Sequence, residues 1–174
     1  SLRRTLQLAS LYPDMEVKSI RGNLQTRLRK LDEGEYSGLI LAAAGLKRLG
    51  LEQRISRYFT VEEILPAAGQ GILAVQGRRG EDYSCLKGYG DREAGICAEA
   101  ERAYVRYLDG GCTSPVAAYG EVQGDRLLLR GLYYREEDGS YIKGEIEGEA
   151  SKACELGIAL ARRLKESMEK GETV

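Results

Sequence analysis

The N-terminal third of the chain alternates between helical and strand-like hydrophobic patterns. Apolar spacing predicts a helix over Leu2–Leu11 and a second helix, capped by Asn23, that runs to Gly34. Between and after these helices, Met15–Ile20 alternates like a strand, and Ser37–Ala44 has the continuous apolar run of a buried strand. An alternation of helices and strands is typical of a parallel α/β layer. We therefore expect the first part of the chain to be an α/β domain.

The middle of the chain is broken by turn signals. A short helix is predicted over Gly45–Leu51, and Val61–Val75 contains two apolar runs around Pro66 and a glycine turn. This stretch is the expected crossover between domains. The expected division is a first domain over 1–62, a crossover segment over 63–80 and a C-terminal domain over 81–174.

The C-terminal part has a clearer pattern. A helical period precedes three strand-like runs separated by turn signals; these segments are Arg92–Leu108, Val116–Val122, Arg126–Arg135 and Tyr141–Glu147. The last helix carries one apolar stripe, formed by Ala153, Leu156, Gly157, Leu160, Leu164 and Met168. The pattern predicts a small α+β domain with a three-stranded antiparallel sheet and helices on one face.

Residue usage excludes several kinds of site. Lys plus Arg number 26 and Asp plus Glu number 27 among 174 residues, so the overall field is weak and does not favour an acidic polymer as partner. The chain has no histidine, and its 4 cysteines lack C-x-x-C spacing, which excludes the usual zinc sites and histidine triads. We therefore expect no metal ligand set and no nucleic-acid partner.

The compartment is indicated by cysteine usage and hydropathy. No apolar run approaches the ~20 residues that span a bilayer, and no signal peptide is visible. We expect a cytoplasmic protein with no membrane partner and reduced thiols. Cys97 and Cys154 lie on helical apolar patterns and are interpreted as packing residues.

Cys112 is the most informative residue of the chain. It lies in the turn Gly-Gly-Cys-Thr-Ser-Pro, where the preceding glycines remove side-chain bulk and Pro115 fixes the exit. A thiol in such a turn is within reach of a small molecule. The alternative from the turn alone is that Cys112 is a small buried hydrophobe.

Arginines recur where ligands of α/β domains bind. Arg3 and Arg4 open the first helix, Arg21 and Arg27 flank the Gly22 turn and the next helix start, and Arg48 follows the predicted strand Ser37–Ala44. Strand ends and helix starts converge on one rim, which would attract anions, above all carboxylates or phosphates. The alternative is a set of solvated helix faces with weak surface pairs, which we adopt for Arg29, Lys30, Arg54 and Arg57.

Five ordered motifs together resemble one family. They are Ser1-Leu-Arg-Arg, Arg21-Gly-Asn-Leu-Gln-Thr-Arg27, Leu41-Ala-Ala-Ala-Gly-Leu-Lys-Arg-Leu-Gly50, Leu65-Pro-Ala-Ala-Gly-Gln-Gly71 and Gly110-Gly-Cys112-Thr-Ser-Pro115. They resemble porphobilinogen deaminases, also called hydroxymethylbilane synthases. The resemblance covers essentially the whole chain and implies a truncated periplasmic-binding-protein-like α/β domain before the α+β domain.

The resemblance also implies a reaction and a cofactor. The family is a transferase of tetrapyrrole, or haem, biosynthesis that joins four porphobilinogen molecules into hydroxymethylbilane and releases ammonia each time. The chain grows on a dipyrromethane cofactor, for which Cys112 matches the thioether position. By the same matching, the cofactor-binding residues are Ser1, Arg3, Arg4, Arg21, Gly22 and Arg27, and the substrate-binding residues are Arg21, Arg27 and Arg48.

The match to the family is partial. The family has three domains, and this sequence begins inside the second, so the resemblance implies that the catalytic aspartate lies in an absent first domain. Asp14, Asp32, Asp91 and Asp109 are interpreted as turn or cap residues, which leaves no catalytic residue in this chain. We expect a portion that is inactive alone and that associates with itself or with an N-terminal piece.

Two other functions compete with this one. An arginine-rich module for small anions or nucleic acid would explain the arginines but not Cys112, and the chain has only 1 Phe and no Trp for stacking bases. A non-catalytic structural or assembly fragment would carry no thioether on Cys112.

Overall fold

The computed structural model describes residues 1–109, 115–135 and 139–171. Cys112 and the rest of its Gly-Gly-Cys-Thr-Ser turn lie outside the described residues, as does Asp138 of a predicted turn. The helices and strands are α1 (Leu2–Leu11), α2 (Leu24–Asp32), α3 (Ala43–Arg48), α4 (Arg92–Tyr107), β1 (Ala117–Gln123), β2 (Arg126–Tyr134), β3 (Tyr141–Glu149) and α5 (Ala153–Lys170). Short 3-10 turns lie at Glu52–Arg54, Ser84–Leu86 and Ala150–Lys152.

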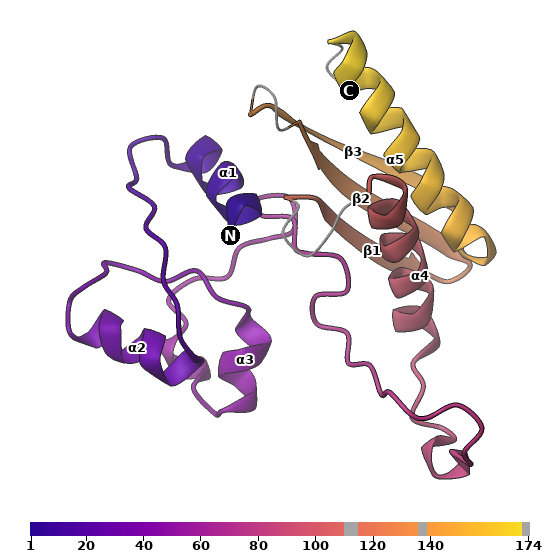
Figure 1. Cartoon of the computed structure of the whole chain (residues 1–174), viewed down its shortest axis with the longest axis horizontal. Helices are drawn as coiled ribbons and strands as arrows, with labels where there is room; N and C mark the ends of the chain where they lie inside the picture. Colours follow the sequence, from indigo (N-terminus) through magenta and orange to yellow (C-terminus); the bar gives the residue numbers. More distant parts are fainter. Residues whose placement is uncertain (110–114, 136–138, 172–174) are drawn as a thin grey trace.

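The C-terminal part forms the predicted α+β unit. Its three strands form an antiparallel sheet in the order β1-β2-β3, with Gly120 opposite Leu129 and Leu129 opposite Ile146. Helices α4 and α5 lie together on one face of the sheet (Figure 1). Gly124, with φ of 65°, makes the tight turn between β1 and β2. The sequence prediction for this part of the chain is confirmed to within about two residues at each element end.

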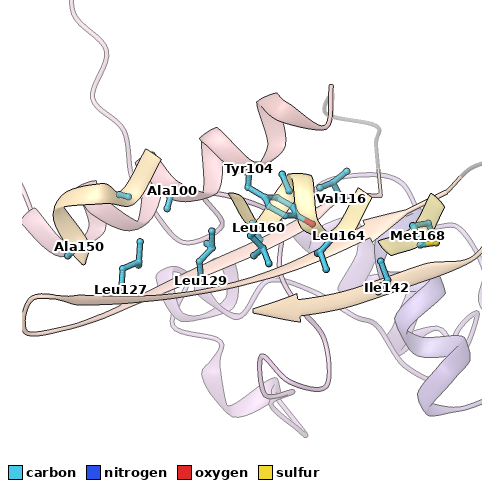
Figure 2. Close-up of a cluster of buried hydrophobic side chains, with 13 residues drawn as sticks. Ala100, Tyr104, Val116, Leu127, Leu129, Ile142, Ala150, Leu160, Leu164 and Met168 are labelled. Carbon is cyan, nitrogen blue, oxygen red and sulfur yellow. The ribbon is translucent and has the colours of Figure 1, made fainter. Parts of the chain in front are cut away.

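The core of this unit lies between the helices and the sheet. Figure 2 shows Leu127 and Leu129 of the sheet pointing to the side on which Tyr104 of α4 and Leu160 and Leu164 of α5 lie, and all five side chains are fully buried. Full burial of each of the four leucines contributes about 1.5–3 kcal/mol. The apolar stripe predicted for the last helix is therefore the face that α5 buries.

Glycines allow the helices and the sheet to approach closely. A Cβ on Gly157 would lie 2.3 Å from the carbonyl oxygen of Ala100, so α5 packs against the backbone of α4. A Cβ on Gly131 would lie 2.7 Å from the ring of Tyr104, so β2 leaves room for this tyrosine. A side chain at either position would displace its neighbours.

The N-terminal part differs from the prediction. Its helices α1 and α2 are where the pattern placed them, but the strands expected over Met15–Ile20 and Ser37–Ala44 are wrong, because neither segment pairs with another in the described ranges and Ala43 already opens α3. Strand pairing needs a neighbour whose N–H and C=O groups face the segment. The expected parallel layer is therefore not formed within the described residues.

Two kinds of feature are absent from the described residues. None of their helices is both long enough and apolar enough to cross a membrane. In the same ranges, no group of three or more Cys, Asp or Glu side chains is placed to hold a metal ion.

Candidate anion-binding site

The first turn of α1 presents the arginine pair. The carbonyl of Ser1 accepts the N–H groups of Arg4 and Thr5, both at 3.0 Å, and so starts the helix. The Ser1 side chain makes no capping hydrogen bond and is exposed. Arg3 and Arg4 therefore leave the same helix start next to a serine hydroxyl that does not cap the helix.

Both arginines line a cavity of about 510 Å³. Arg4 Nη1 donates to the carbonyl of Ile40 at 3.1 Å, and Arg3 Nη1 donates to the carbonyl of Val116 at 3.4 Å. The cavity walls are mainly apolar and include Leu28, Leu46, Tyr58 and Leu65. The Val116 contact brings the start of α1 beside the segment that leads into β1 (Figure 1).

The electrostatics of the cavity favour an anion. Partial burial lowers the pKa of Arg3, and the nearby guanidinium of Arg4 lowers it further. Partial burial likewise lowers the pKa of Arg4, with a further contribution from the guanidinium of Arg27. Both remain charged at neutral pH because an arginine pKa is so high. In the described part of the chain none of these three arginines forms an ion pair. Partly desolvated cations without acidic neighbours fit a ligand that carries carboxylates.

The Gly22 turn sets the start of α2. Gly22 has φ of +118°, and a Cβ there would lie 3.0 Å from Thr26 Cγ2, so glycine is required both by conformation and by space. The Asn23 side chain accepts the N–H of Thr26 at 2.8 Å and caps the helix. Arg27 Nε donates to the carbonyl of Gly22 at 2.8 Å, which holds this guanidinium at the turn.

The predicted arginines separate into two groups. Arg3, Arg4 and Arg27 are half-buried and interact electrostatically, whereas Arg21 and Arg48 are exposed. Of these five arginines, only Arg3 and Arg4 line the cavity. The missing parallel layer explains this separation, because the rim on which all five were expected to converge requires that sheet.

The four cations assigned to surface pairs have the predicted acidic partners, and two of them, Arg54 and Arg57, also line the cavity. Arg29 contacts Glu33 at 2.7 Å, Lys30 contacts Glu35 at 3.4 Å, Arg54 contacts Asp32 at 2.5 Å, and Arg57 pairs with Glu63. These cations have acidic partners, which distinguishes them from Arg3, Arg4 and Arg27.

The described cysteines are free thiols with different environments. Cys97 is half-buried against Gly120, and its pKa is raised by burial and then by Glu101 and other nearby acids, so it is a packing residue as predicted. Cys154 is exposed, so the packing role predicted for it is wrong. Its position on α5 faces away from the stripe that contacts the sheet, because the buried neighbours are Ala153 and Gly157.

Two buried polar side chains were missed by sequence reasoning. Gln7 is 1% exposed and Glu101 is 4% exposed, and both hydrogen-bond the backbone of the Leu65–Gly69 loop. Gln7 lies at a buried position of an amphipathic helix, which was the available signal. Glu101 lies beside Ala100 on the buried face of α4, where a charged residue interrupts an apolar stripe.

The fold is a segment with partly buried arginines, followed by a small α+β unit. Residues 1–85 match the family described as "Porphobilinogen deaminase, dipyromethane cofactor binding domain", and residues 95–166 match "Porphobilinogen deaminase, C-terminal domain". The chain belongs to the porphobilinogen deaminase family.

Named relatives are similar over nearly the whole chain. A porphobilinogen deaminase of Ruminiclostridium josui is 52% identical over 167 residues, which cover 96% of this chain and 57% of the relative. The porphobilinogen deaminase of Alkaliphilus oremlandii is 53% identical, over 95% of this chain and 55% of the relative. That of Roseiflexus sp. is 45% identical, over 94% of this chain and 54% of the relative. The chain thus spans about half the length of the curated relatives it matches.

Proposed function

We propose that this chain is the portion of a porphobilinogen deaminase that carries the dipyrromethane cofactor on Cys112 and binds its carboxylates. The whole enzyme would be a transferase of tetrapyrrole biosynthesis that makes hydroxymethylbilane from four porphobilinogen molecules. The observation that carries this proposal is the cluster of Arg3, Arg4 and Arg27. These arginines are partly buried, Arg4 lies close enough to both others for their charges to interact, and none has an acidic partner in the described ranges.

The residues present fit a dipyrromethane. Each pyrrole ring carries an acetate and a propionate, and a guanidinium binds a carboxylate through two parallel hydrogen bonds. Arg3 and Arg4 would hold such carboxylates from the cavity, and Arg27 from the Gly22 turn. The Ser1 hydroxyl would add a neutral hydrogen bond. When bound, the cofactor would supply the pyrrole on which the product chain begins.

Arg21 and Arg48 would bind substrate carboxylates, together with Arg27. Both are exposed and form no ion pair with a described acid, so each can turn toward a ligand. The finer fold assignment belongs to the same proposal. Residues 1–62 would be part of a periplasmic-binding-protein-like α/β domain, 63–80 a crossover segment, and 81–174 the domain of the cofactor cysteine.

The placement of Cys112 in the chain supports its role. The elements on either side of its turn, α4 and β1, pack against each other in the C-terminal unit, and Arg3 reaches the carbonyl of Val116 just after the turn. Cys112 would bond through sulfur to the methylene that porphobilinogen exposes when ammonia leaves. A thiolate is the nucleophile such a bond requires.

Partners and compartment follow from the same proposal. Leu73 and Val75 in the predicted crossover are 79% and 75% exposed, so we expect this chain to bind a second copy of itself or the N-terminal portion of the enzyme. Light scattering at a defined concentration tests this, and a monomer of unchanged mass would count against it. Free thiols at Cys85, Cys97 and Cys154 favour the cytoplasm.

Reconstitution tests the proposed function. The chain would be combined with the N-terminal portion of the Ruminiclostridium josui relative that it does not match, and then supplied with porphobilinogen. We expect release of ammonia and formation of hydroxymethylbilane, which neither part gives alone. Cys112→Ser should abolish the activity, whereas the matched control Cys154→Ser should retain it. Equal activity of both variants would contradict the role of Cys112.

A further inference from the structure

The Leu65–Gly69 loop is held at both ends by buried side chains that the proposed function does not use. Gln7 of α1 and Glu101 of α4 are those side chains, and we call the two residues together the polar clamp. Among the described residues the buried polar side chains are Gln7, Glu101 and Ser167, so the clamp contains two of these three. Burying a polar group is costly unless it is hydrogen-bonded, so the partners of these two side chains show what the side chains hold in place.

Gln7 binds the first residue of the loop through both of its polar atoms. Its Oε1 accepts the N–H of Leu65 at 2.8 Å, and its Nε2 donates to the carbonyl of Leu65 at 3.1 Å. The same Nε2 also donates to the carbonyl of Arg3 at 3.2 Å. The amide of Gln7 therefore fixes the loop against the turn of α1 that presents Arg3 and Arg4.

Glu101 binds the other end of the loop. Its Oε2 accepts the N–H of Gly69 at 2.5 Å, and its Oε1 accepts the N–H of Gly120 at 2.8 Å. Burial raises the pKa of this carboxyl, and the two backbone donors act against that effect. One carboxylate thus joins three segments: the loop, α4 and β1.

The clamp connects the two halves of the proposed site. Helix α4 ends at Tyr107 and β1 begins at Ala117, so these are the elements before and after the Cys112 turn in the sequence. Glu101 fastens both elements to the loop, and Gln7 fastens the loop to α1. The direct contact from Arg3 to Val116 is long at 3.4 Å, so the clamp provides the stronger link between the arginines and the flanks of the cysteine turn.

Filling space alone would not need polar side chains at these two positions. An apolar residue at position 7 or 101 could fill the same volume without the cost of burying an amide or a carboxylate. What apolar residues cannot do is fix the loop at two particular N–H groups. The chemistry of the clamp is therefore that of orientation.

We propose that Glu101 and Gln7 are positioning residues. They hold the arginines of α1 close to the segments before and after the Cys112 turn, so that the arginines bind the carboxylates of the same cofactor that the thiol attaches. This inference rests on the proposed function. It predicts that the clamp matters for attachment of the cofactor while the thiol itself stays accessible.

The test uses variants at both ends of the clamp in the reconstituted protein described above. Glu101→Gln places an NH₂ group against one of two backbone donors, and Gln7→Leu removes the contacts to Leu65. Glu99→Gln, on an exposed position of the same helix, is the matched control. The rate of dipyrromethane attachment is followed by denatured intact mass, and alkylation of Cys112 by iodoacetamide reports accessibility of the thiol.

We expect Glu101→Gln and Gln7→Leu each to slow attachment by about tenfold, while alkylation of Cys112 changes less than about twofold. The double variant should be little slower than either single one, because the two residues act through one loop. Glu99→Gln should match the unchanged chain. A normal attachment rate in both single variants would overturn the proposal. It would also be overturned if the rate losses of the single variants multiplied in the double variant and matched the losses of thermal stability.

A second measurement keeps this inference separate from the proposed function. If the unchanged chain attaches no cofactor under conditions in which the full-length relative does, the proposed function fails. Hydrogen exchange of the backbone amides then tests the positioning role of the clamp by itself. In Glu101→Gln we expect faster exchange at Gly69, at Gly120 and in α1, and in Glu99→Gln no change. Unchanged exchange in α1 would overturn the positioning role.

Discussion

The two halves of this chain differ in how their backbone segments find hydrogen-bonding partners. In the C-terminal half each strand pairs with the next one along the chain, and α4 and α5 cover the resulting sheet. In the N-terminal half α1, α2 and α3 are joined by extended segments that form no ladder with one another. Antiparallel hairpins supply their own neighbours locally, whereas parallel strands depend on partners far away in the sequence. The cysteine turn therefore belongs to the self-sufficient half, and the arginines to the dependent one.

The largest expected effect is on the core of the C-terminal half. Leu129→Ala removes a fully buried side chain and should lower the free energy of unfolding by about 2–5 kcal/mol. Leu73→Ala, at a position 79% exposed in the other half, should change it by less than about 0.5 kcal/mol. Urea unfolding followed by circular dichroism measures both. Similar losses at the two positions would remove the contrast between the halves.

The next effect concerns the unpaired and paired arginines of the N-terminal half. Arg4→Ala should weaken binding of a dipyrromethane by about 10- to 100-fold, because a charge-assisted hydrogen bond from a partly buried guanidinium is lost. Arg29→Ala, which loses only the exposed pair with Glu33 and does not line the cavity, should bind as the unchanged chain does. Isothermal titration measures both affinities. Equal affinities would mean that Arg4 of the cavity does not bind the cofactor.

A smaller effect is expected at the turn before α2. Gly22→Ala forces a side chain into a backbone with φ of +118° and against Thr26, which should cost about 1–3 kcal/mol. Gly34→Ala is the control, because its φ is also positive at +80° but its Cβ would meet nothing within 4 Å. Thermal unfolding compares the two. A smaller loss at Gly22 than at Gly34 would show that Thr26 does not restrict this turn.

The smallest effect is the pH dependence of the clamp. Burial raises the pKa of Glu101 above its ordinary value of 4.5, so the folded chain holds this proton more tightly than the unfolded chain does. The contribution of Glu101 to stability is therefore largest below pH 4.5 and falls as the pH rises through the folded pKa. Urea unfolding from acid to neutral pH should show this decline relative to Glu101→Gln. A parallel pH dependence in the two proteins would contradict it.

The sequence predicted the C-terminal half well because its signals are local. Turn residues such as Gly124, the alternation in β2 and the stripe on α5 each act over a few positions. The same local logic placed α1, α2 and the Asn23 cap. It failed for Met15–Ile20, since a strand-like pattern does not provide a neighbour to pair with.

The candidate site was predicted only in part. Arg3, Arg4 and Arg27 came from motifs, and the structure adds that they are partly buried and coupled. Gln7 and Glu101 could not be assigned from the sequence, because their partners are backbone groups of Leu65, Gly69 and Gly120, and a backbone group leaves no mark on residue identity. Polar residues on buried helix faces were the only hint.

The central claim is that Cys112 carries the cofactor held by these arginines. The most direct measurement is the denatured intact mass of the chain after incubation with porphobilinogen and the N-terminal portion of the Ruminiclostridium josui relative, followed by peptide mapping. The account predicts an added dipyrromethane on the peptide that contains Cys112. An unmodified Cys112, under conditions in which the full-length relative gains the cofactor, would contradict it.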